Sequence, residues 1–393
     1  MPLPSIRQLT VAAVALAMAG GLSACGSDSS DTPAGSASTT AGDPHTLNVT
    51  ISAADGCASD RKTLDAGAVT VKITNRDATG VSEIELLSGE RIIGEKENLP
   101  PGFSGNFTVE VGAGTYTLYC PGAATEKSPL TVTGAAASSA DTSTDALLAA
   151  GTKQWGEYVE TQVGYLVTGA RALSTALKGT DLAAAQTAYK KARSYYEKIE
   201  PVAESFASGS QDLDADIDAR EGDVPAARWR GFHRIEKGLF ADKKLAGLAT
   251  FGDGLVTNTK KLQALTTGLT YKPFELANGA QELLDEVSAS KITGEEERYS
   301  HIDLLDVQSN VEGAEQAFAD LQPGLAKIDP TLASTVSSQF TALNTLVGKY
   351  RSTTDPSGFR LYTTLTNDDK KALAAAVKAV QEPLSRVASK VTR

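Results

Sequence analysis

A histidine and a glutamate three residues apart carry the most specific chemistry in this sequence. In GFHRIEKGL, residues 231–239, His233 precedes Glu236 by one helical turn, so both side chains project from one face of the expected helix. Imidazole and carboxylate groups bind divalent and trivalent metal ions. Two ligands do not complete a metal site, and a packed histidine beside an exposed acid has the same spacing. The pair alone therefore leaves both interpretations open.

Carboxylates in the preceding segments favour a metal ion. Glu197, Glu200 and Glu204 form one stripe in SYYEKIEPVAESF, a pattern that is usually a solvated helix face. Pro201 lies inside this helical pattern and cannot donate to the carbonyl of Glu197, so we expect a kink there. The acid-rich segment DLDADIDAREGD then offers Asp214, Asp216, Asp218 and Glu221. Carboxylates that converge in a bundle repel one another unless a cation lies among them, so the sequence favours a cation site.

The elements that must position these residues are helical. In Asp181–Phe206 apolar residues recur at three- and four-residue steps, which predicts one long amphipathic helix. Further helices are predicted at Leu147–Leu177, Ala226–Ala249, Leu255–Leu269, Pro273–Ser288, Glu295–Leu321, Pro330–Tyr350 and Asn367–Val391. We therefore predict an all-α bundle over residues 146–393.

The first half of the chain has the period of β-strands instead. TLNVTIS, AVTVKITN, SEIELLS, NFTVEV and GTYTLYC alternate apolar and polar residues and are separated by Gly, Asn and Asp clusters. About seven short strands predict a small all-β sandwich over residues 45–134. The following TGAAASSADTSTD predicts a linker at residues 135–145.

The β half lacks the ligands of a blue-copper electron carrier. Such a site needs two histidines, a cysteine and usually a methionine. The only histidine near this half is His45, and no methionine follows Met18. Cys57 and Cys120 remain, with four glutamates between them: Glu83, Glu85, Glu95 and Glu97. A Cys57–Cys120 disulfide and a metal site are equal alternatives if the chain is exported.

The N-terminus predicts export. Val11–Gly20 is apolar but too short to span a bilayer, and Leu22–Cys25 resembles the lipobox of bacterial lipoproteins. Residues 1–25 are thus expected to be a signal peptide with Cys25 as the lipidated residue, and 26–44 a flexible tether. The alternative is a plain secretory signal with a chance cysteine. The formal net charge of −11 disfavours nucleic acid as a partner.

Long segments of the chain resemble a known family. YYEKIEPVAE, DIDARE, GFHRIEKGLF and ITGEEERYSHIDLLDVQSNVEGAEQAF resemble the imelysin-like domain of EfeO-type components of bacterial ferrous-iron uptake systems. KENLPPGFS and GTYTLYCPG resemble the cupredoxin-like domain that precedes it in that family. The resemblance implies a two-domain protein, a small all-β cupredoxin-like sandwich followed by an all-α imelysin-like helical bundle.

The same resemblance implies a function. The chain would be a non-enzymatic, lipid-anchored protein on the outer face of the cytoplasmic membrane. It would capture Fe2+ or Fe3+ and pass the iron to an EfeU-type permease, with an EfeB-type haem peroxidase as a second partner. Carboxylates with one histidine are hard ligands that suit iron better than copper.

The family's hallmark H-x-x-E metal site implies His233 and Glu236 as ligands. Asp218 and Glu200 follow as further ligands, on the matching DAR and IEP motifs. Glu197 and Glu221 are additional candidates. His301, four residues after Glu297, is expected to have a structural role.

In the β half the resemblance implies a copper or iron site made by Cys57, Cys120 and Glu85. Ala58 departs from the family, because some relatives carry a glutamate at this position. A thiol pair that binds metal when reduced and forms a disulfide when oxidised would satisfy both alternatives for the two cysteines.

Two other functions compete with iron uptake. Imelysin-like domains have been classed with peptidases, and a hydrolytic zinc site usually needs three protein ligands plus an acid or base. The H-E-x-x-H motif of many zinc peptidases is absent from the sequence. A metal-dependent binder of acidic polysaccharide is the other alternative.

Overall fold

A computed structural model describes residues 43–81, 83–97, 99–135, 142–208, 211–355 and 357–392 of the chain. The expected signal peptide and Cys25 lie outside these residues. None of the helices in the described ranges is both long and apolar enough to cross a bilayer.

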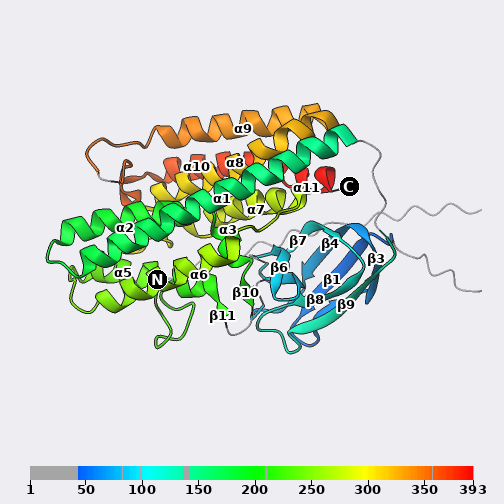
Figure 1. The fold of residues 1–393 in the computed structure, drawn as a ribbon, viewed down its shortest axis with the longest axis horizontal. Helices are drawn as coiled ribbons and strands as arrows, with labels where there is room; N and C mark the ends of the chain where they lie inside the picture. The colour runs from blue at the N-terminus through cyan, green and yellow to red at the C-terminus, as the bar shows by residue number, and fades with distance from the viewer. Residues whose placement is uncertain are drawn as a thin grey trace, which may run out of the picture. The chain divides into compact units, whose positions relative to one another are not determined.

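Two β-sheets form between residues 46 and 133 (Figure 1). In the first, the strand order is β2 (Gly56–Ser59), β1 (Thr46–Ser52), β4 (Gly67–Asn75) and β7 (Ser104–Val111). In the second, it is β3 (Thr63–Asp65), β9 (Lys127–Thr133), β8 (Gly114–Tyr119), β5 (Ile84–Ser88) and β6 (Arg91–Lys96). Alternate residues of both sheets, such as Val71 and Leu118, are buried in one shared core. The predicted two-sheet β region is confirmed.

A disulfide joins the two sheets. Cys57 lies on β2 and Cys120 directly follows β8, and their sulfurs are bonded. The disulfide alternative is therefore the one that this structure contains. In this oxidised state neither sulfur is a thiolate, so the predicted cysteine–glutamate metal site is not formed. That site stays a prediction for the reduced chain only.

Replacing both cysteines by alanine is expected to lower the free energy of unfolding by about 2–4 kcal/mol, because the disulfide closes a long loop in the unfolded chain. The two cysteines are 63 positions apart in the sequence. Chemical denaturation of the wild-type and Cys57→Ala/Cys120→Ala proteins measures the difference. Wild-type protein in reductant is the control, and it should unfold as the variant does. Equal midpoints for all three samples would mean that the sheets do not need the bond.

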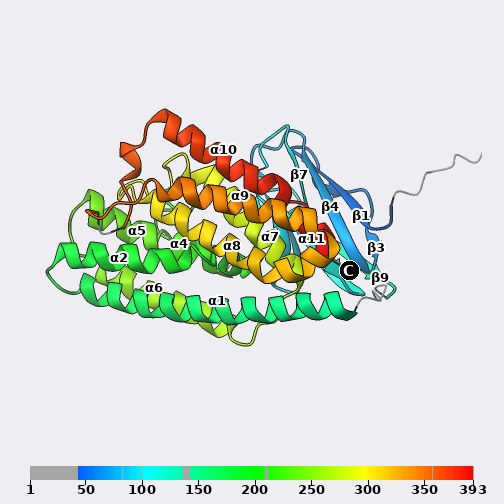
Figure 2. The same cartoon turned by 90° about the horizontal axis from the view of Figure 1, so that it is seen from above.

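The second half of the chain is helical (Figures 1 and 2). The long helices are α1 (Thr142–Leu177), α2 (Leu182–Tyr196), α6 (Ala249–Thr266), α7 (Pro273–Glu286), α8 (Asp303–Ile328), α9 (Pro330–Gly348) and α10 (Asn367–Leu384). The short helices are α3 (Glu200–Glu204), α4 (Leu213–Asp218), α5 (Phe232–Glu236) and α11 (Val387–Val391). α8 packs against α1, α7 and α9, and its apolar side chains, including Val307 and Val311, lie at the centre of the core. The predicted bundle is confirmed.

The expected interruption at Pro201 is also confirmed. The predicted helix Asp181–Phe206 divides into α2, which ends at Tyr196, and α3, which begins at Glu200 with Pro201 in its first turn. Proline has no N–H to continue the hydrogen-bond ladder, but it fits a first turn, whose N–H groups have no helical partner.

One predicted helix is wrong over much of its length, and another begins later than predicted. Most of Ala226–Ala249 is irregular, apart from α5 and the π-helical turn η1 (Lys237–Ala241). The helix predicted from Glu295 begins only at Asp303. Its expected first two turns form a loop instead, because their carboxylates and N–H groups pair with side chains from other elements. Sequence periodicity does not report such tertiary contacts.

Candidate metal centre

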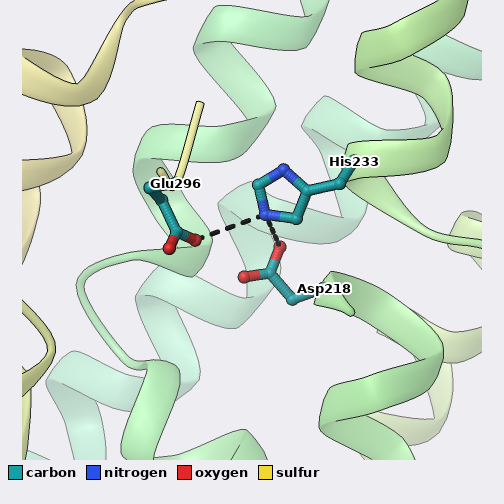
Figure 3. Close-up of side chains that lie close together, drawn as sticks. All are labelled: Asp218, His233 and Glu296. Carbon is teal, nitrogen blue, oxygen red and sulfur yellow. Dashed lines mark ion pairs between the residues drawn. The ribbon is translucent and has the colours of Figure 1, made fainter. Parts of the chain in front are cut away.

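A glycine lets α5 begin directly against the end of α4. Gly231 has φ +83°, and a Cβ atom there would lie 2.1 Å from the carbonyl oxygen of Ile217. Only glycine adopts this conformation and leaves this space at no steric cost. Because Asp218 is the next residue after Ile217, the contact brings His233 beside Asp218 (Figure 3).

Two π-helical turns border the same region. α5 continues into η1, and α7 continues into η2 (Val287–Lys291). In η2 the N–H of Ile292 donates to the carbonyl of Val287, 2.9 Å away. A π-helical turn shifts the following side chains around the helix axis, and such turns are frequent at functional sites. Here η2 ends with Lys291 fully buried in the bundle.

His233 presents one ring nitrogen to two carboxylates from distant segments. Its Nε2 lies 3.5 Å from Oδ1 of Asp218 and 3.3 Å from Oε1 of Glu296 (Figure 3). The histidine is 1% exposed, and in the described part of the chain Nε2 has no hydrogen-bond partner. A buried nitrogen that makes no hydrogen bond is costly, and a cation held by the nitrogen and both carboxylates would satisfy it. The residues therefore fit a metal ion with nitrogen and oxygen ligands.

A second group of ligand atoms adjoins the first. Asp218, His233 and Glu296 each offer an atom within 4.8 Å of the others, and so do Glu197, Glu200, Asp218 and Glu296. All five residues are buried. We call them the central cluster. Among the described residues no other group of three or more such side chains meets this spacing.

Two fully buried cations of the protein balance part of this charge. Arg193 Nη2 lies 2.5 Å from Glu197 Oε1 and 2.7 Å from Glu296 Oε1, and Nη1 pairs with Asp218. Lys291 Nζ lies 3.0 Å from Glu200 Oε2 and 3.3 Å from Glu197 Oε2. Buried carboxylates need such partners, since unpaired charges are strongly unfavourable in the interior.

The surroundings shift the pKa values of the cluster in different directions. Burial alone lowers the pKa of His233, but the Asp218 and Glu236 carboxylates together outweigh it, and the net pKa lies well above its usual range. Burial alone raises the pKa of Glu296, but Lys291, His233 and Arg220 hold it well below its usual range. For Glu200 burial prevails over Lys291, and the pKa is raised. In the absence of metal ions, the cluster is thus expected to keep protons on His233 and Glu200 that a metal ion would displace.

Glu236 lies on the other side of the imidazole. Its Oε2 is 3.2 Å from Nδ1 of His233, and its Oε1 accepts from the N–H groups of Tyr299 and Ser300, both at 2.8 Å. A carboxylate on Nδ1 sets the orientation of a histidine that binds metal through Nε2. The structure brings Glu236 to the ring but into neither ligand group, so its predicted role as a direct ligand stays a prediction.

Glu236→Gln is expected to weaken metal binding about 10- to 100-fold, because the amide removes the charge that orients the ring and raises its basicity. Competition with a chelator of known affinity measures the change. Glu221→Gln is the matched control, since Glu221 pairs with Lys237 at 2.6 Å and lies outside the central cluster. Unchanged affinity would contradict the orienting role, whereas complete loss of binding would make Glu236 a direct ligand.

The other predicted residues lie in several places. Glu200 and Glu197 belong to the second ligand group, whereas Glu221 does not. His301 has φ +57°, and its backbone carbonyl accepts from the N–H of Tyr362 at 2.9 Å. These contacts involve the backbone of His301, and the structural role expected for its side chain stays a prediction. Glu85 lies on β5 and is 4% exposed.

Glu296 is the functional candidate that sequence reasoning missed. It belongs to both ligand groups and receives Arg220 Nη1 at 2.8 Å. The only signal was the run of three glutamates in ITGEEERYS, at the start of the helix predicted over Glu295–Leu321. This run of like charges next to Gly294, in a chain with only three histidines, could have identified Glu296 as a candidate ligand.

Comparisons with known proteins place the chain in a family. The Imelysin family model (Peptidase_M75) matches residues 151–387, a range that contains the whole central cluster. Proteins described as "Iron uptake system component EfeO" from Escherichia coli O157:H7, Escherichia coli K12 and Shigella flexneri are each 38% identical over 331 residues. These alignments cover 83% of this chain and 86% of each relative. The chain therefore belongs to the imelysin family, as a homologue of the EfeO iron uptake components.

Proposed function

We propose that this protein is a non-enzymatic iron carrier that binds its cargo in the central cluster and passes it to a membrane permease. The observation that carries the proposal is the buried Nε2 of His233, which has no hydrogen-bond partner in the described residues and faces two carboxylates. The relatives' description as iron uptake components supports iron as the cargo.

The donor set supports iron over softer metals. Asp218, His233 and Glu296 would hold the ion, with Glu197 and Glu200 available from the adjoining group. One imidazole and several carboxylates are hard or borderline ligands that suit Fe2+ and Fe3+, whereas copper(I) prefers sulfur. Arg193 and Lys291 hold these carboxylates in place when no cargo is present. Because no cysteine or methionine joins the cluster, the site suits binding and release of iron.

The location and partners in this proposal follow from the family. The chain is exported, anchored through lipidated Cys25 on the outer face of the cytoplasmic membrane, and works with an EfeU-type permease and an EfeB-type haem peroxidase. The Cys57–Cys120 disulfide supports an oxidising compartment. Copper or iron in the β half belongs to the proposal only for the reduced protein.

Iron uptake into cells tests the proposal. A strain of the source bacterium that lacks this gene would carry either the wild-type gene or His233→Ala, and uptake of radioactive iron would be measured under iron limitation. Wild type should restore uptake and the variant should not, at equal protein levels in the membrane fraction. Full uptake with the variant would refute a carrier that works through the central cluster.

Metal affinity is expected to fall as the pH falls. The pKa values of His233 and Glu200 are raised, so both groups hold protons that iron must displace. Each displaced proton lowers the apparent affinity about tenfold per pH unit below its pKa. Anaerobic Fe2+ titrations at pH 5, 6 and 7 measure this slope. An affinity that does not change over this range would contradict displacement of protons.

The family description as a peptidase supports one alternative. A zinc-loaded sample should then cleave a peptide library, and Glu236→Gln should abolish the cleavage. If mass spectrometry detects no product from the wild-type protein, the peptidase alternative is refuted.

A further inference from the structure

A cavity lined by carboxylates opens onto the central cluster. It has a volume of about 210 Å³ and reaches Glu200, Asp218 and Glu296 at its inner end. A second cavity, of about 180 Å³, has no residue of the central cluster in its lining and is called the outer cavity. The two cavities share Glu83, Glu97, Glu204 and Asp214. They therefore adjoin each other along four carboxylates, two from the β half and two from the helical half.

Strands β5 and β6 each place a pair of carboxylates beside the outer cavity. Glu83 and Glu85 are two residues apart at β5, and Glu95 and Glu97 are two residues apart at β6, so each pair shares a face of the sheet. Glu85 and Glu95 are direct cross-strand partners. Like charges in this position destabilise a sheet unless something neutralises them.

One of these carboxylates has a buried oxygen that makes no hydrogen bond. Glu85 is 4% exposed and lines the outer cavity, and its Oε2 has no hydrogen-bond partner in the described part of the chain. Burial, together with the charge of Glu83, raises the pKa of Glu85 to about 8. A buried acceptor of this kind, on a residue that lines a polar cavity, indicates a missing ligand.

The lining residues supply little positive charge of their own. Arg220 is the only basic residue among the described residues that line either cavity, and it lines the inner one. Its guanidinium is already paired with Asp223 at 3.2 Å and Glu296 at 2.8 Å. A dense set of carboxylates without matching bases attracts cations from solution.

We propose that the outer cavity, at Glu83, Glu97, Glu204 and Asp214, is a second cation site through which a hydrated divalent cation reaches the central cluster. No three side chains around this cavity come within the 4.8 Å spacing of the two ligand groups in the described residues. The cation therefore keeps part of its water shell and is held more weakly than in the central cluster. The onward passage rests on the proposed function, whereas the site itself does not.

Titration of the intact protein with Mn2+, followed by the electron paramagnetic resonance signal of free Mn2+, tests this site. Wild type is expected to bind two ions, one at least about tenfold more weakly than the other. A four-fold neutral variant should lose the weaker ion and keep the tighter one: Glu83→Gln, Glu97→Gln, Glu204→Gln and Asp214→Asn. His233→Ala should lose the tighter ion and keep the weaker one.

A matched control removes the same number of charges from exposed positions: Asp65→Asn, Glu90→Gln, Asp242→Asn and Glu382→Gln. This control should bind both ions, and circular dichroism should show the wild-type helix content for every variant. The inference is overturned if the cavity variant still binds two ions, or if the surface control loses the weaker ion as well.

The outcomes separate this site from the proposed function. If the cavity variant binds no ion and His233→Ala binds as wild type, the outer site stands and the central cluster does not hold metal. If wild type binds one ion that only His233→Ala removes, the outer site is refuted and the carrier stands.

Discussion

His233→Ala is expected to weaken Fe2+ binding by the intact protein at least about 100-fold. Loss of a residue that merely orients a metal ligand costs about 10- to 100-fold, and a ligand itself should cost no less. His233 also provides the only nitrogen in the central cluster. Anaerobic titration against a competing Fe2+ chelator measures the affinity, and the same titration with Zn2+ shows whether the loss is general.

The matched control for this variant is His301→Asn. His301 is the other histidine of the helical half, and asparagine tolerates its positive φ of 57°. The control should keep the wild-type affinity. Equal affinities for His233→Ala and wild type would move iron binding elsewhere and return His233 to the role of a packed core histidine.

Replacing Arg193 by methionine is expected to destabilise the metal-free protein by about 3–5 kcal/mol, because its removal leaves buried carboxylates without a partner. Arg193 is fully buried and pairs with carboxylates on four different elements or loops: Glu197, Asp218, Glu296, Glu297 and Asp306. Methionine keeps most of the side-chain volume, so the loss of stability measures the missing positive charge and not a new cavity. Thermal and urea unfolding in the presence of a chelator measure the effect.

A bound cation should recover part of this loss. A metal ion in the central cluster offers the carboxylates a new partner, so saturating Zn2+ or Fe2+ should raise the stability of Arg193→Met more than that of wild type. Arg171→Met, at an exposed position on α1, is the control and should change stability by less than about 0.5 kcal/mol. A variant that is as stable as wild type without metal would show that the carboxylates are held protonated and need no internal cation.

The sequence predicts much of the site because several of its signals are local. His233 and Glu236 are separated by one helical turn, and the break at Pro201 follows from the missing N–H of proline. The acid-rich segments offer Glu200 and Asp218 among several candidate carboxylates, and only the resemblance to family motifs distinguishes these two. Their convergence with Glu296 could not be predicted from the sequence. It depends on long-range contacts such as that between Arg193 and Glu296, which are 103 positions apart in the chain.

The sequence by itself determined a β half followed by a helical half, and a helix face suited to a metal ion. These properties depend on periodicity and turn residues over a few neighbouring positions. Only the tertiary structure decided that Nε2 of His233 faces Asp218 and Glu296 while Glu236 holds Nδ1. It also decided that Cys57 and Cys120 are bonded, and that Arg193 and Lys291 lie among the carboxylates. Such contacts join side chains from separate elements in a buried, poorly screening interior, where their free energy depends on how the elements pack.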